Sequence, residues 1–219
     1  MRRNHAIIPI LLTAMFILSS PIASIAVAND LNPLPKNAAV IYVGNPYEDV
    51  SEAVCEALSD PSVPGVFVID QNLIEERYAN SDSGDLATGT GYTLKNRQYK
   101  GVLTGATRLA TAAGMPGITV GISQTKSVAN SNSCSVPIAM NQLDAGVGCK
   151  SSASEDITIS GSSAVPDRVG AREVSSMTVI ANPVYDYYSY DIYRGGTFID
   201  RGFAKHAVGV YFWRRYAYR

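Results

Sequence analysis

The chain has 219 residues, of which 46% are hydrophobic and 17% are charged, and these proportions suit a globular protein and exclude a disordered one. The formal net charge is only −1, and the basic residues are scattered rather than arranged in a stripe, so a nucleic-acid-binding role is not supported.

Residues 1–28 have the features of a secretory signal peptide. Two arginines precede an apolar run from Ala6 to Leu18, which is shorter than the roughly 20 residues that span a bilayer. The small residues Ala26-Val27-Ala28 match the cleavage pattern of a signal peptidase. We therefore predict a mature chain that begins at Asn29, is secreted to the periplasm or the cell surface, and has no integral membrane span after cleavage.

Charge is distributed in blocks along the mature chain. Residues 29–85 contain 11 acids and 2 bases, whereas residues 86–143 contain 5 bases and no acid. Residues 144–200 then contain 8 acids and 4 bases, and residues 201–219 contain 5 bases and no acid. We expect these blocks to pair within one fold, and pairing between copies is the alternative.

The first mature elements indicate a strand, a helix and a second strand. Ala38 to Val43 is an apolar, β-branched run, and Asn45-Pro46 is typical of the start of a helix, which we expect from Tyr47 to Leu58. Val66 to Ile69 is a second short apolar run. The two strands would then be parallel, with a right-handed crossover between them.

The next elements complete a predicted α/β-like half that covers residues 29–122. The polar stretch from Asn80 to Gly91 predicts an exposed loop. The apolar spacing from Gln98 to Ala113 predicts a second helix, and Ile118 to Ile122 predicts a third strand.

Residues 123–163 predict a long surface loop, because they include eleven serines and little periodicity. Cys134 and Cys149 both lie in this stretch, and secretion favours a disulfide between them. Closing a loop of about 16 residues stabilises a fold by roughly 3 kcal/mol in the chain-entropy model. Cys55 is left over on the first predicted helix. It is interpreted as a buried free thiol, with an intermolecular bond, a bond to one of the other cysteines or a catalytic thiol as alternatives.

Residues 164–219 predict an antiparallel, Tyr-rich sheet that contains eight of the thirteen tyrosines. The strands are expected at Met177–Ile180, Val184–Tyr193, Thr197–Phe203 and Ala207–Trp213. Arg194-Gly195-Gly196 is typical of a hairpin turn, since glycine adopts the positive φ that such turns require. The fold class predicted for the whole chain is therefore α+β, with residues 29–219 forming one domain.

Catalytic and metal sites are not supported by the sequence. His206 is the only histidine after cleavage, so a zinc site with two imidazoles from one chain is impossible, and we predict no metal and no cofactor. A Ser-His-Asp triad lacks its G-x-S-x-G motif. Paired acids on the first helix, such as Glu52 and Glu56, are interpreted as a solvated face, although a carboxylate-based hydrolase would need two that converge across a cleft.

Two aromatic groups are the candidate interaction residues. In an extended strand Tyr185, Tyr187 and Tyr193 share one face, which core packing, sugar stacking or a protein interface would each explain. The terminal run contains the second group, which is Tyr211, Phe212, Trp213, Arg214 and Arg215. Its strand either closes the sheet or is donated to a neighbouring subunit.

These observations lead to a functional hypothesis. We expect a secreted, non-enzymatic binding or assembly protein of the cell envelope, such as an accessory or structural subunit of a surface appendage or of a secretion machinery. The alternative is a small carboxylate-based hydrolase or a carbohydrate-binding module that acts on envelope polysaccharide. A protein partner or self-association is expected, a glycan ligand is the other option, and nucleic acid is not expected.

Overall fold

The computed structural model describes residues 31–33, 35–44, 50–71, 73, 86–87, 91–138 and 154–219. The predicted signal peptide lies outside the described residues. The elements are β1 (Leu31–Pro33), β2 (Ala39–Val43), α2 (Ser51–Ser59), β3 (Gly65–Asp70), β4 (Leu86–Ala87), β5 (Tyr92–Gly105), β6 (Ala110–Gly114), β7 (Thr119–Ala129), β8 (Ser131–Ser133), β9 (Ser154–Ala164), β10 (Arg168–Val169), β11 (Arg172–Arg194) and β12 (Thr197–Tyr218).

The predicted α+β class is wrong, because the part of the chain that the structure describes is mostly β-sheet, with 69% strand against 7% helix. The segment Gln98–Ala113, predicted as a helix, lies in β5 and β6 and the turn between them. Gly101 has φ +107° and Gly105 has no room for a Cβ beside Pro183, and neither feature suits a helix interior. Pairing with β11 therefore decides the structure of this segment.

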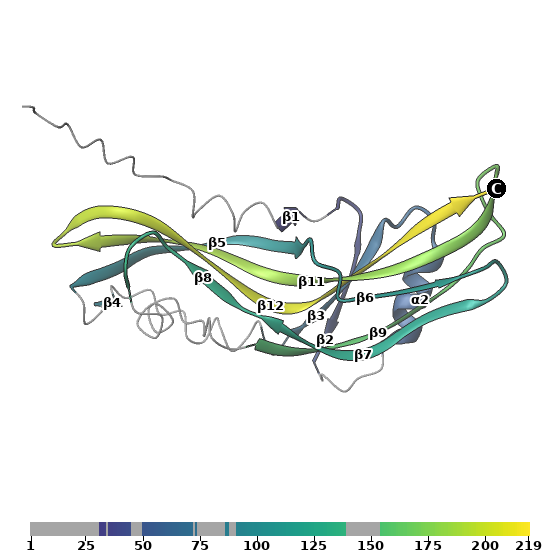
Figure 1. Cartoon of the computed structure of the whole chain (residues 1–219), viewed down its shortest axis with the longest axis horizontal. Coiled ribbons are helices and arrows are strands. Elements are labelled where there is room, and N and C mark those ends of the chain that lie inside the picture. Colours follow the sequence, from purple (N-terminus) through teal and green to yellow (C-terminus); the bar gives the residue numbers. More distant parts are fainter. Residues whose placement is uncertain are drawn as a thin grey trace, which may run out of the picture.

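A long antiparallel pair, β11 and β12, forms the centre of the fold, and we call it the central hairpin (Figure 1). The four strands predicted in this region merge into these two. Gly195 and Gly196 have φ values of +57° and +81°, which fits a two-residue type I′ turn between the paired residues Arg194 and Thr197. The predicted hairpin turn is thus confirmed, and it fixes which residues of the two strands lie opposite each other.

Shorter strands extend the central hairpin on both sides into one large mixed sheet. The strand order is β1-β5-β11-β12-β3-β2, with β6 also paired to β11 and β8 also paired to β12. β2 and β3 are parallel, and α2 lies between them in the chain. The predicted strand, helix and parallel strand are therefore confirmed as a local unit, with the helix described from Ser51 rather than Tyr47, but this unit lies at the margin of a β-rich fold.

The prediction of a loop over residues 123–163 is wrong for the described part of that stretch. β7 and β9 pair along their whole length as a second, two-stranded sheet. Serine and threonine on the exposed side alternate with buried residues such as Ile122, Val128 and Ile159. The abundance of serine suggested a loop. Exposed and buried side chains alternate along these segments, however, as they do in a β-strand with one solvent-exposed face. Residues 139–153, including Cys149, lie outside the described residues.

The main hydrophobic core lies between the central hairpin and a layer made by α2 with the β7–β9 pair. Val54 and Leu58 of α2, Ile159 of β9 and Phe212 of β12 are almost fully buried in it. Side chains of this size each contribute about 1.5–3 kcal/mol when fully buried. Along the other part of the hairpin, residues 134–138 contribute to a smaller cluster around Tyr190.

Gly209 of β12 is a sensitive position in this arrangement, because it lies opposite Ile69 of β3 and Val184 of β11. An added Cβ would overlap the carbonyl oxygen of Val68, which cannot move without disturbing the β3–β12 pairing. We expect Gly209→Ala to lower the free energy of unfolding by about 3 kcal/mol. Gly44→Ala is the control, since no atom lies within 4 Å of its added carbon. Urea unfolding compares the two variants, and equal stability would contradict this packing.

Candidate functional site

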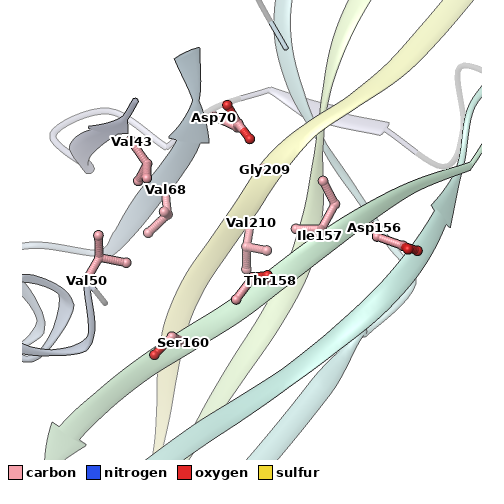
Figure 2. Close-up of a pocket in the computed structure, with 10 residues that line it drawn as sticks. All are labelled: Val43, Val50, Val68, Asp70, Asp156, Ile157, Thr158, Ser160, Gly209 and Val210. Carbon is pink, nitrogen blue, oxygen red and sulfur yellow. The ribbon is translucent and has the colours of Figure 1, made fainter. Parts of the chain in front are cut away.

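A small cleft lies between the end of the β2–β3 pair, β9 and β12 (Figure 2). Val43, Val68 and Val210 are among the residues that line it, and its volume of about 40 Å³ admits little more than one water molecule. Asp70 and Asp156 are the acids at this cleft, and Figure 2 shows Asp156 pointing away from Asp70. A glycosidase needs two carboxyl groups that flank a sugar, and this cleft does not supply them.

The side chains that could bind a metal ion do not cluster either. In the part of the chain that the structure describes, no group of three or more His, Cys, Asp and Glu residues could hold a metal ion. Within the same residues, no helix is both long and apolar enough to cross a membrane.

Three of the predicted interaction residues belong to the core. Tyr185, Tyr211 and Phe212 are buried, and Tyr211 stacks on Phe67 with 4.4 Å between ring centroids. Burial raises the pKa of Tyr211. Core packing, one of the explanations considered for these aromatics, is therefore what the structure shows for this group.

Two further predicted residues are half-buried and support the sheet. Tyr187 stacks on Phe203 with parallel rings 5.5 Å apart, and burial raises the pKa of Tyr187. Trp213 donates from its indole N–H to Oδ1 of Asn182 at 2.8 Å. Asn182 in turn donates to the carbonyl oxygen of Gly105 at 3.0 Å and so ties the end of β5 to the central hairpin.

The two terminal arginines have different surroundings. Arg214 donates to the carbonyl oxygens of Asp60 at 2.5 Å and Val63 at 3.1 Å, and so holds the segment after α2. Arg215 is exposed. The strand that carries both residues is paired within the chain, on β11 along its length and on β3 from Gly209 to Trp213. Donation of this strand to a neighbour is therefore not the arrangement observed.

Among the described residues, neither Cys55 nor Cys134 forms a disulfide. Cys134 is half-buried, its thiol lies 3.4 Å from the carbonyl oxygen of Val136, and burial raises its pKa. Cys55 is half-buried on α2. Because Cys149 lies outside the described residues, the Cys134–Cys149 disulfide stays a prediction.

The strand β2 forms one open edge of the large sheet, and we call it the β2 edge. No other strand of the described residues pairs with it besides β3. Val40 and Tyr42 are 44% and 61% exposed, whereas Val43 on the other face is buried. The sequence predicted this strand, but its place at an edge depends on sheet order, which the sequence did not reveal.

A second exposed apolar group lies at the turn of the central hairpin, and we call Tyr193–Ile199 the hairpin tip. Tyr193 contacts Phe198 edge-on with ring centroids 5.8 Å apart. Phe198 and Ile199 are 50% and 44% exposed. Only Tyr193 of this group was a predicted interaction residue, so the tip combines one predicted residue with two that sequence reasoning missed.

Cations of β5 and β11 lie over the rings beside the tip. Lys95 Nζ is 5.8 Å from the centroid of Tyr193, and the Arg194 guanidinium is 5.4 Å from the centroid of Tyr92. Both distances are within the range of cation–π interaction. The tip is therefore an exposed surface of mixed aromatic, aliphatic and cationic character.

Acidic side chains near the tip are held by hydrogen bonds. Arg201 Nε donates to Asp191 at 2.8 Å and Asn96 donates to its other oxygen at 3.0 Å, and the Arg201 bond is the main reason that the pKa of Asp191 is lowered. Burial alone would raise the pKa of Asp200, but hydrogen bonds from the hydroxyl and N–H of Ser135 outweigh it, so that this pKa is lowered too. Both acids are ionised at neutral pH.

Comparisons with known proteins give no family. No family model matches the chain, and no curated protein matches it. A crystal structure of a Bacteroides fragilis protein of unknown function, suggested to be membrane-associated, matches with 12% identity and a TM-score of 0.26. The match covers 86% of this chain and 78% of that one. A likeness at this level supports no conclusion about fold or function.

The pKa of Asp191 tests the ion pair beside the tip. Because the carboxylate form is favoured in the folded protein, the pair stabilises the fold above the ordinary aspartate pKa and loses this effect as pH falls through the lowered value. We expect Arg201→Gln to raise the pKa of Asp191 toward 3.8, measured by NMR titration. Asp60 is the internal control, because Ser62 is the main cause of its lowered pKa. An unchanged Asp191 would contradict the pairing.

Proposed function

We propose that the protein is a secreted, non-enzymatic binding or assembly protein of the cell envelope, and that it binds an extended segment of a partner protein at the β2 edge. The partner segment would add to the sheet as a further strand, by main-chain hydrogen bonds. The observation that carries this proposal is the exposure of an apolar strand at the margin of the large sheet.

An unprotected strand at a sheet edge is unusual in a protein that remains monomeric and binds no partner. Edge strands present unpaired N–H and C=O groups, and proteins protect them with charges, prolines or bulges. The strand Ala39–Val43 contains no charged residue and no proline. Its pairing with β3 runs without a register shift. Within its described residues, the β2 edge therefore has no charge, proline or bulge to protect it.

Charge around the β2 edge favours a basic partner. Of the residues that the structure describes between 31 and 73, four are acids (Glu52, Glu56, Asp60 and Asp70) and one, Lys36, is a base. Asp70 lies opposite Val43 at the end of the parallel pair, and Glu52 and Glu56 lie on α2. A second copy of the chain would bring two acidic regions together, which costs free energy, whereas a segment with basic flanks would be attracted. The proposed partner is therefore an apolar extended segment flanked by lysine or arginine.

The enzyme alternative has less support from the geometry. The cleft at Asp70 is too small for a sugar, and the acids near the hairpin tip are engaged by Arg201 and Ser135. Of the rings that the sequence suggested for sugar stacking or another interface, Tyr185, Tyr211 and Phe212 are buried.

Peptide binding tests the proposal directly. Two fluorescent peptides of alternating valine and threonine, one flanked by lysines and one by glutamates, are titrated into the mature protein and followed by anisotropy. We expect the lysine peptide to bind at least about tenfold more tightly, a difference of about 1.4 kcal/mol, and to weaken with added salt. Tyr42→Lys should abolish binding, because it places a charge on the edge.

Met115→Lys is the matched control, since Met115 is 72% exposed on the turn between β6 and β7. This variant should bind like the wild type. Equal binding of the two peptides, or equal loss in both variants, would contradict the proposal. Sedimentation of the protein alone adds a second check, because dimers that Tyr42→Lys dissociates would show that a second copy, rather than a basic partner, occupies the edge.

A further inference from the structure

We infer that the hairpin tip binds an anionic lipid surface. This inference uses the cell-envelope location of the proposed function but not the β2 edge, which belongs to a different part of the sheet. It depends on three features of the tip, namely its exposed apolar side chains, its charge and its position in the molecule.

The apolar side chains are exposed because the strand is irregular at this point. The pairing of β11 with β12 shifts between Ile192 and Tyr193, so that Ile199 is an extra residue on β12. Such a bulge interrupts the alternation of a strand and redirects side chains. Thr197, Phe198 and Ile199 are consequently exposed in succession. Phe198 and Ile199 can both enter an apolar phase without any change in the paired strands behind them.

The aromatic and cationic groups around these residues suit the boundary between lipid and water. Tyrosine rings with a polar end are enriched at the headgroup level of membranes. Tyr193 and Tyr92 occupy this position beside the tip, with Lys95 and Arg194 over their rings. Cations near an anionic membrane surface are each attracted by about 1 kcal/mol, which corresponds to about fivefold in affinity.

The described residues at and beside the tip carry the net charge that an anionic surface requires. The ranges 92–100 and 191–201 contain five bases and two acids. Both acids are engaged within the protein, Asp191 by Arg201 and Asp200 by Ser135. This basic region contrasts with the acids Glu52 and Glu56 of α2.

The position of the tip allows contact with a flat surface. Figure 1 shows the turn of the central hairpin at one end of the long axis, with the C-terminus at the other end. The turn between β6 and β7, which exposes Met115 and Ile118, lies at the end with the C-terminus. A lipid surface can therefore meet the tip without meeting this second apolar turn.

Vesicle binding tests the inference. The mature protein is sedimented with vesicles of phosphatidylcholine alone and with vesicles that contain about 30% phosphatidylglycerol. We expect binding to the anionic vesicles only, weakened by salt. The double variant Phe198→Ser with Ile199→Ser should lose at least about tenfold in affinity, since two apolar side chains no longer leave water. Arg194→Gln should lose about fivefold.

The matched control is Met115→Ser with Ile118→Ser, which removes two exposed apolar side chains, 72% and 52% exposed, from the other turn and should bind like the wild type. A second readout uses Phe198→Trp, because Trp213 is the only other tryptophan of the chain. Its added fluorescence should be quenched by brominated lipid tails, whereas the wild-type signal from Trp213 should not be.

The outcomes separate this inference from the proposed function. If the tip variants lose vesicle binding but still bind the lysine peptide normally, the result supports both the lipid inference and the proposed function. Wild-type protein that binds the peptide but not the anionic vesicles overturns the lipid inference alone. Equal vesicle binding by the tip and control variants also overturns it, as does binding of envelope glycan fragments at the tip in place of vesicles.

Discussion

The register between β11 and β12 is the constraint on which the rest of the structure depends. Gly195 and Gly196 close the turn with positive φ angles, which other residues adopt only at a cost in conformational free energy. This turn sets which residues of β11 and β12 lie opposite each other. β5 and β6 then pair with one side of the central hairpin, while β3 and β8 pair with the other. A slip of one residue would turn Phe212 out of the main core and would take Tyr211 away from Phe67, against which it packs on the other face of the sheet. Close contacts at Gly209 and Gly202 leave no room for such a slip.

The central hairpin also separates two surfaces of opposite charge. Its middle supports the acidic β2–α2–β3 unit, in which an apolar strand is exposed at the sheet edge. Its end forms a basic tip with exposed Phe198 and Ile199. The two surfaces would attract different ligands, a basic extended segment at the edge and an anionic lipid surface at the tip. A protein that joins such ligands needs a rigid connection between them, which two continuous strands provide.

The sequence predicted local features of the fold better than its class. Local patterns correctly predicted the strand at Ala38–Val43, which is observed at Ala39–Val43, as well as the helix before Asp60 and the glycine turn of the hairpin, because each depends on neighbours in the chain. It failed at Gln98–Ala113, where small apolar residues match a helical spacing equally well and pairing with β11 decides the outcome. The strand predicted at Ile118–Ile122 matches the start of β7, whereas the serine-rich remainder of β7 and β9 is predicted as a loop, since its polar face dominates the composition.

The candidate sites were predictable only in part, for a related reason. Tyr193 was identified at the tip, but Tyr185, Tyr211 and Phe212 are core residues, because burial depends on the layers above and below a strand. The exposure of Val40 and Tyr42 follows from sheet order, which one sequence does not contain. Charge blocks were visible in the sequence, but which charges share a surface depends on strand pairing, as where β5 brings Lys95 beside Tyr193 of β11.

Hydrogen exchange of the mature protein, read by mass spectrometry, tests most directly whether the central hairpin is the stable centre of the fold. We expect the slowest exchange in β11 and β12 where both edges are paired, from Gly209 to Trp213 and in the residues opposite them. The β2 edge and the hairpin tip should exchange much faster. Exchange of β12 as fast as that of β2 would contradict this account, because it would mean that the terminal strand is open in solution.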